Sequence, residues 1–219
     1  MIESKSRALY IGASDTSQVV GSWKTETFKK WWQQKLGIDY TPSLGNKYTM
    51  AGTYYEHAIL DALGIENKDA QILLPELRLR VNYDGITFGD GIEIHEVKTH
   101  KADKEFKVSK QYWRQAQVEM YAILASYRIP ARLYINAYPM TEEHYRDYFI
   151  PIDKSLIKSI RVDYDPDFIS EYLGKLSYLK ECIDKGAFPT EEGYEKHIAG
   201  KQTVLPDGGD KRAAQTSHI

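Results

Sequence analysis

Two acidic residues and a lysine are spaced so that their side chains would meet in space. Asp84 precedes a glycine-rich turn signal at residues 89–91, and Glu96 and Lys98 follow it. In a β-hairpin centred on Asp90, Asp84 and Glu96 lie equally far from the turn and face each other on one side of the sheet. Lys98, two residues beyond Glu96, emerges on that same face.

This spacing predicts a particular chemistry. Two carboxylates held so close repel each other unless a cation neutralises them. Mg²⁺ suits this place because it prefers carboxylates, waters and phosphate oxygens, and we expect Mn²⁺ to substitute for it. The backbone carbonyl of Val97 would add another oxygen ligand, and Lys98 would hold the attacking water and balance charge on a phosphate. The pattern therefore predicts metal-assisted hydrolysis of a phosphodiester.

Two other interpretations of the hairpin have to be weighed. An isolated Glu-x-Lys is ordinarily a solvated strand edge, and Asp-Gly is ordinarily a turn. Apolar residues at the intervening positions favour a packed hairpin that carries a site: these are Ile86, Phe88, Ile92, Ile94 and Val97. Asp90 is a rival for the aspartate role, but its place between two glycines favours turn formation.

The elements that must position these residues follow from hydrophobic periodicity and chain breakers. We expect a short helix between Ser14 and Gly21, and further helices at about 25–36, 50–63, 109–127 and 167–185. Strands are expected at about 72–83, interrupted near Pro75, and at 85–88, 92–99, 132–138 and 145–152. The central order of helix, three strands, helix and strand predicts an α/β (α+β) mixed sheet with helices on its faces.

Length and composition bound the possibilities further. The 219 residues suit a single domain, here residues 1–199, followed by a polar, glycine-rich and flexible tail at 200–219. The formal net charge of -2 neither favours nor excludes DNA, since near-neutrality can hide a local basic groove. No apolar run is long enough to span a membrane and no signal peptide is evident, so the chain reads as cytoplasmic.

The same residues resemble a known family. Asp84-Gly85 followed by Glu96-Val97-Lys98 resembles the PD-(D/E)XK signature, and four blocks between Arg7 and about Phe188 are similar to the lambda exonuclease / YqaJ viral recombinase family. The resemblance implies a restriction-endonuclease-like core. It also implies a Mg²⁺-dependent exonuclease that digests one strand of linear duplex DNA from its 5′ end during phage-type recombination.

The first two blocks imply roles outside the hairpin. Arg7 and Ser14 match the family's residues that hold the 5′-phosphate, although Ser14 could equally be a simple helix cap. Glu56 matches the glutamate of a G-x-x-x-E pattern that faces the metal centre. It also lies in an otherwise apolar helical stripe, where a carboxylate calls for a partner, while a place on the surface rim stays open.

The remaining blocks add polar residues near the expected site. Asn82 stands where the family often has serine or proline before its Asp-Gly, and it could still bind phosphate. Gln115 and Gln117 match the family's Q-x-Q-x-x-M helix, whose glutamines approach the catalytic water and the DNA backbone. Tyr121 shares a helical face with Gln117 and is a further candidate for DNA contact. Ordinary helix surface is the alternative for either glutamine.

Several functional alternatives stay open at this point. The same site could serve an endonuclease or a nickase, or the fold could be an inactive module that binds DNA or a partner. The single cysteine, Cys182, disfavours an iron–sulfur nuclease. The resemblance implies a bacterial host cell with phage or prophage origin, a single-strand annealing protein as partner and a homo-oligomeric ring. Four lysines after the catalytic strand could line a DNA groove or a solvated loop: Lys101, Lys104, Lys107 and Lys110.

Overall fold

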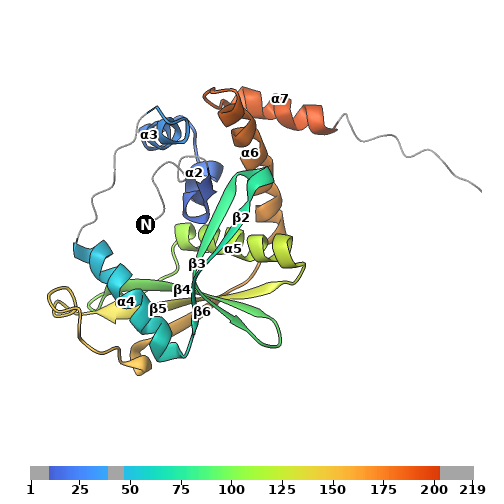
Figure 1. The fold of residues 1–219 in the computed structure, drawn as a ribbon. Helices are drawn as coiled ribbons and strands as arrows, with labels where there is room; N and C mark the ends of the chain where they lie inside the picture. The colour runs from blue at the N-terminus through green and yellow to red at the C-terminus, as the bar shows by residue number, and fades with distance from the viewer. Residues whose placement is uncertain (1–9, 39–46, 203–219) are drawn as a thin grey trace, which may run out of the picture.

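Helices pack on both faces of a six-stranded mixed sheet in the computed structural model, which describes residues 10–38 and 47–202 (Figure 1). The strands are β1 (Ile11–Gly12), β2 (Asn67–Leu74), β3 (Leu79–Phe88), β4 (Ile92–Lys101), β5 (Ala131–Met140) and β6 (Lys158–Val162). The α-helices are α2 (Thr16–Val20), α3 (Glu26–Lys35), α4 (Lys47–Leu63), α5 (Lys110–Tyr127), α6 (Pro166–Asp184) and α7 (Glu191–Gln202). Three short 3-10 turns are η1 (Ala13–Asp15), η2 (Pro75–Leu77) and η3 (Lys154–Leu156).

The sheet has the strand order β1-β3-β4-β5-β6, and β2 pairs with β3. β4 runs parallel to β5 and β1 runs parallel to β3, whereas the other pairs are antiparallel. Along the chain, α4, β2, β3, β4, α5 and β5 follow one another. This is the predicted order of helix, three strands, helix and strand, so the predicted fold class is confirmed.

The hairpin of β3 and β4 has the predicted register. Its pairs run from Phe88 opposite Ile92 to Gly85 opposite His95, which centres the hairpin on Asp90. Asp90 is exposed at the tip. The turn itself is closed by the backbone N–H of residue 89, which donates to the carbonyl of residue 91 at 3.0 Å.

Beyond Gly85 the two strands of this hairpin separate. One edge of β3 pairs with β2, from Leu79 to Ile86. Its other edge pairs with β1 at Leu79 and Arg80, and with β4 only from Gly85 onward. Among the described residues, no strand pairs with residues 81–84 on that edge. The sheet therefore has a gap, and Asp84 lies at its border.

One predicted strand, at residues 145–152, is wrong, and one strand boundary is misplaced. The predicted interruption near Pro75 is confirmed: the chain reverses in η2, where Arg78 adopts the left-handed conformation with φ 50°. β3 then runs from Leu79 to Phe88 without the break that was expected at residue 84. The reversal makes β2 and β3 antiparallel neighbours. Residues 145–152 form turns and irregular chain instead of a strand. Their side chains Tyr145, Tyr148 and Ile150 are partly buried against a hydrophobic core that includes α4.

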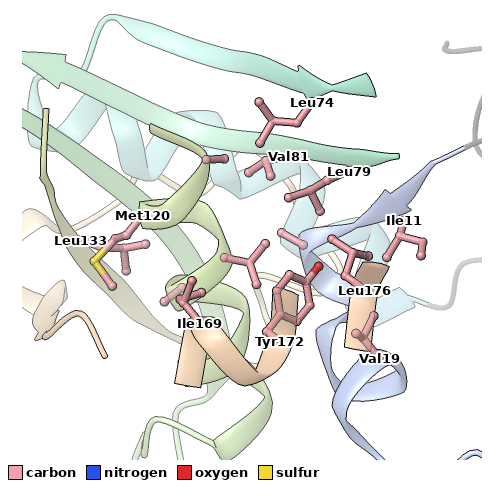
Figure 2. Packing of buried hydrophobic residues seen from close by; sticks show 14 of the residues in the cluster. Ile11, Val19, Leu74, Leu79, Val81, Met120, Leu133, Ile169, Tyr172 and Leu176 are labelled. Atoms are coloured by element: carbon pink, nitrogen blue, oxygen red, sulfur yellow. The ribbon is translucent and has the colours of Figure 1, made fainter. Parts of the chain in front are cut away.

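Two hydrophobic cores hold the helices to the sheet. The larger lies between the sheet and the helices α2, α3, α5 and α6. Figure 2 shows Ile11, Val19, Leu79 and Tyr172 meeting there from four different elements. The smaller core packs α4 against the opposite face of β4 and β5. Both faces of β4 are therefore buried near the gap, which fixes the strand that carries Glu96 and Lys98.

The ends of the chain differ from the sequence-based expectation in one respect. A further helix, α7, runs from Glu191 to Gln202 beyond the predicted last helix. The predicted flexible tail lies, after Gln202, outside the described residues. No helix in the described part of the chain combines the length and the apolar character that crossing a membrane requires.

Candidate active site

Asp84 lies where β3 leaves β4. Its Oδ2 accepts a hydrogen bond of 2.7 Å from the backbone N–H of Val97, so the carboxylate stays attached to β4 although strand pairing ends at Gly85. Strand pairing ends at Gly85 and His95, one residue before Asp84 and Glu96, and the two acids lie close enough for Glu96 to raise the pKa of Asp84. The gap in the sheet thus brings the two acids together.

Gly85 explains why an Asp-Gly pair stands at this point. A Cβ atom on Gly85 would lie 2.9 Å from side-chain carbons of both Leu60 and Ile65, at the end of α4. Tyr83 and Ile86 both pack into the larger core although they are three residues apart, so the usual alternation of the strand breaks between them. A larger residue at position 85 would force these side chains to shift, so glycine allows β3 to pass close to the end of α4 beside Asp84.

A chain of polar contacts links β4 to α5. Lys98 Nζ forms an ion pair with Glu96 Oε1. The amide nitrogen of Gln115 donates to Glu96 Oε1 at 2.7 Å and to Glu119 Oε1 at 2.7 Å. Both hydrogens of the Gln115 amide are thereby directed at carboxylates, which fixes the orientation of that side chain.

The cluster is electrostatically crowded. Burial raises the pKa of Asp84, and the nearby Glu96 and Glu56 raise it further. Burial likewise raises the pKa of Glu56 on α4, and Glu96 adds to the effect. Burial alone would lower the pKa of Lys98, but Glu96 and Asp84 outweigh it and leave the pKa above its ordinary value. Lys98 therefore stays charged among acids that repel one another.

The residues present fit a divalent cation. Oε2 of Glu96 and Oε2 of Glu119 are buried and have no hydrogen-bond partner within the described residues. A buried acceptor without a partner costs about 1–3 kcal/mol, and more when it is charged. Hard carboxylate oxygens are the ligands that Mg²⁺ prefers, and its charge would relieve the repulsion between Asp84 and Glu96. The predicted ligand roles of Glu56 and of the Val97 carbonyl stay predictions.

A second group of donors lies next to Glu56. Single ligand atoms of Glu56, His57 and Asp69 lie within 4.8 Å of one another. His57 Nε2 and Asp69 Oδ2 are 3.0 Å apart, and both side chains are mostly exposed. His57 and Asp69 thus contact each other at the surface, an arrangement that needs no bound ion.

Glu119 is a member of the cluster that the sequence analysis missed. It is fully buried, and burial raises its pKa, as does the nearby Glu96. A signal was present: Glu119 follows Gln115 by four residues, on the same helical face, and lies between Val118 and Met120 in a buried stretch of α5.

Replacement of Glu119 by Gln tests this assignment through stability. Because its folded-state pKa is raised, the native protein binds a proton more tightly than the unfolded chain, so Glu119 lowers stability as the pH rises above about 4.3. The contribution of Glu119 to the unfolding free energy of the metal-free wild type should therefore fall as the pH rises above its unfolded-state pKa. In Glu119→Gln this contribution is absent, so the unfolding free energy of the variant should fall less, or rise more, with increasing pH than that of the wild type.

Urea unfolding at several pH values in the presence of EDTA measures the difference. Glu195→Gln, at an exposed position in α7, is the matched control and should follow the wild type. An identical pH dependence in Glu119→Gln and the wild type would contradict a raised pKa for Glu119.

Three predicted site residues have contacts with groups outside the cluster. Gln117 is fully buried and holds the start of α6: its Nε2 donates to the Asp163 carbonyl at 2.8 Å, and its Oε1 accepts from the Asp165 N–H at 2.7 Å. Tyr121 packs against the larger core. Asn82 is exposed on the β2–β3 pair, where its Oδ1 accepts from a glutamine of β2 at 2.7 Å. Both polar atoms of Gln117 are thus occupied by backbone groups that precede α6, and the predicted roles of Gln117, Tyr121 and Asn82 stay predictions.

The predicted phosphate-binding residues are only partly covered by the structure. Arg7 lies outside the described residues. Ser14 is exposed, and it is not the N-cap of η1 or α2, positions that Gly12 and Asp15 occupy. The alternative interpretation of Ser14 as a helix cap is therefore wrong. Its predicted phosphate contact stays a prediction.

Comparison with solved structures supports the architecture. The alkaline exonuclease LHK-Exo from Laribacter hongkongensis gives a TM-score of 0.60 at 18% identity, over 90% of this chain and 97% of that chain. LHK-Exo in complex with dAMP gives a TM-score of 0.57 at 19% identity, over 90% and 97% of the two chains. A phage-related exonuclease from Haemophilus somnus gives 0.50 at 15% identity, over 88% and 96%.

At these identities the likeness concerns the fold. The chain has the architecture of alkaline and phage-related exonucleases along almost their full length, as the sequence resemblance implied. No family model matches the sequence, and no curated protein does so either. What the chain does must therefore be argued from its own residues.

Proposed function

We propose that this chain, whose fold is that of the alkaline and phage-related exonucleases, is itself a Mg²⁺-dependent DNA exonuclease. The observation that carries the proposal is the cluster at the gap in the sheet. There Asp84 and Glu96 are held together around a charged, largely buried Lys98. An arrangement so costly to fold is typical of a site whose purpose is chemistry.

The acids of the cluster would hold the cation. Asp84 and Glu96 supply carboxylate oxygens, and Glu56 and the backbone carbonyl of Val97 are proposed as further ligands. When bound, Mg²⁺ supplies a Lewis acid for the scissile phosphate and lowers the pKa of a bound water.

Two further side chains, Lys98 and Gln115, would contact the phosphate and the attacking water. Lys98 keeps its charge, so it can stabilise the negative charge that develops on the phosphate oxygens. Gln115 uses both amide hydrogens on Glu96 and Glu119, so its carbonyl oxygen is left to accept a hydrogen bond from the attacking water. Gln115 is thereby proposed as a residue that orients the nucleophile.

The finer parts of the proposal rest on the family resemblance. Digestion from the 5′ end depends on Arg7 and Ser14 as ligands of the terminal phosphate, and Ser14 is exposed and so accessible to it. A role in phage-type recombination, a ring of identical subunits and an annealing partner belong to the same part of the proposal. They are tested separately from catalysis.

Digestion of matched DNA substrates tests the function. A linear duplex with 5′-phosphates should be degraded to acid-soluble nucleotides in Mg²⁺ or Mn²⁺, and degradation should stop in EDTA. A 5′-hydroxyl duplex should be cleaved more slowly if Arg7 and Ser14 bind the terminal phosphate. Covalently closed circular duplex should stay intact, because an exonuclease needs an end.

The alternatives give different results in the same assay. Cleavage of the closed circle would replace the exonuclease by an endonuclease or nickase that uses the same residues. Absence of metal-dependent cleavage on every substrate would favour an inactive binding module and would contradict the proposal.

A further inference from the structure

A cleft of about 590 Å³ opens from the catalytic cluster toward the end of β4. Its inner end is formed by Glu56, Val97 and Lys98, and its outer end by Tyr48 and Tyr145. The volume falls within the range of about 300–1,000 Å³ that is typical of small-molecule sites. The catalytic groups use only the inner end, so the outer part requires its own explanation.

Aromatic rings line this cleft at both ends. Tyr112, at the start of α5, lies at the inner end with the Lys98 ammonium 5.1 Å from its ring centre. At the outer end the rings of Tyr48 and Tyr145 meet edge to face, with centres 5.0 Å apart. Tyr48 is 39% exposed although it is a large aromatic residue. Exposed aromatic rings of this kind offer stacking and edge contacts to a flat ligand.

Cations alternate with these rings. Lys101 Nζ lies 5.2 Å from the centre of the Tyr48 ring, and Lys104 follows on the same turn, where its N–H donates to the Lys101 carbonyl at 3.0 Å. Tyr48 acts most strongly on Lys101, partly through a side-chain hydrogen bond, and Glu142 and Asp103 act on it more weakly from outside the cleft. A local concentration of lysines in a chain of net charge -2 points to an anionic ligand.

We infer that the outer cleft is a nucleotide-binding groove. A base of the cleaved strand stacks on the Tyr48–Tyr145 pair, and the adjoining phosphate lies at Lys101 and Lys104. Alternating aromatic and cationic side chains are the arrangement with which proteins bind single-stranded nucleic acid without reading its sequence, because every base has a stacking face. The groove would therefore hold nucleotides of any base.

This inference depends on the proposed function in one point only: that the nucleic acid strand in the groove is the one that the active site cleaves. Nucleotide binding can be measured without cleavage, with dAMP and deoxyadenosine as probes. Calorimetric titration in Mg²⁺ gives both affinities, and the steady-state digestion of linear duplex gives KM and kcat. The two kinds of readout separate a failure of the groove from a failure of the nuclease.

Two double variants separate the contribution of stacking to nucleotide affinity from the contribution of charge. Tyr48→Leu with Tyr145→Leu should weaken both probes by about 5- to 100-fold, the effect of losing a stacked base. Lys101→Gln with Lys104→Gln should weaken dAMP and leave deoxyadenosine within about twofold. The tyrosine pair should raise KM far more than it lowers kcat, since the acids and Lys98 are intact.

Matched variants control for folding. Tyr48→Phe with Tyr145→Phe keeps the rings and should keep the affinity for both probes. Tyr127→Leu removes a tyrosine that is 52% exposed at the far end of α5, outside the cleft, and should also bind normally.

Two results would contradict the proposal of a nucleotide-binding groove. One is an affinity for dAMP that is the same in the leucine pair and in Tyr127→Leu. The other is loss of binding in the phenylalanine pair equal to that in the leucine pair. Tyrosine-dependent binding of dAMP by a protein that digests no DNA would instead support the groove and contradict the nuclease.

Discussion

Asp84→Asn should reduce the rate of DNA hydrolysis by at least about 10²–10³-fold, the effect of losing a key electrostatic group in an active site. The substitution removes one of the two opposed carboxylates and leaves an oxygen that can still accept from the Val97 N–H. Because burial and Glu96 raise the pKa of Asp84, a neutral side chain suits this position. We therefore expect unchanged or slightly higher stability together with the loss of activity.

Asp90→Asn is the matched control, since Asp90 belongs to the same hairpin but is exposed at its tip. Rates on 5′-phosphorylated linear duplex and urea unfolding curves should be measured for both variants. An Asp84→Asn enzyme with wild-type rates would remove Asp84 from the mechanism. It would make Asp90 the aspartate to examine.

Lys98→Met should affect both activity and stability. The ammonium of Lys98 is paired with Glu96, whose side chain is almost completely buried. Removal of one partner of a buried ion pair costs about 3–5 kcal/mol, because the other charge is left without compensation. We expect that loss of unfolding free energy in metal-free buffer, and at least a 10²-fold loss of cleavage rate in Mg²⁺.

Lys107→Met provides the comparison, because Lys107 is exposed and its pairing with Glu105, at 3.3 Å, is also exposed. It should change the unfolding free energy by less than about 0.5 kcal/mol. A Lys98→Met protein as stable as this control would mean that Glu96 does not depend on Lys98 for its charge compensation.

The β3–β4 hairpin could be predicted because its geometry is local. A two-strand hairpin with a glycine-rich turn fixes which residues face each other, and Asp84 and Glu96 are related by that rule alone. Glu56 could be anticipated in a similar way, since a carboxylate in an apolar helical stripe needs a partner, and the structure sets it close to Glu96.

The glutamine helix shows where local rules end. Helical phase sorts residues into faces, but α5 has buried neighbours on several sides. Phase alone does not tell which face meets β4 and which meets α6. Gln115 faces the cluster with Glu119, whereas Gln117 binds the backbone that precedes α6. The choice between them depended on tertiary packing.

The wrong strand at residues 145–152 has a related cause. Its tyrosines and isoleucines have a high strand propensity. In the structure, however, these residues lie in turns and irregular chain, where Tyr145, Tyr148 and Ile150 are partly buried against the core that includes α4. The strand at this edge of the sheet, β6, is short, and only two of its residues, Ile160 and Val162, are apolar. Such a strand gives a weak hydrophobic pattern.

Binding of Mn²⁺, followed by electron paramagnetic resonance in the absence of DNA, tests the central claim most directly. The two opposed acids should hold the ion, so the wild type should bind Mn²⁺, and Asp84→Asn and Glu96→Gln should each bind it at least about tenfold more weakly. Equal affinity in all three proteins would contradict the assignment of a metal-dependent active site to the gap between β3 and β4.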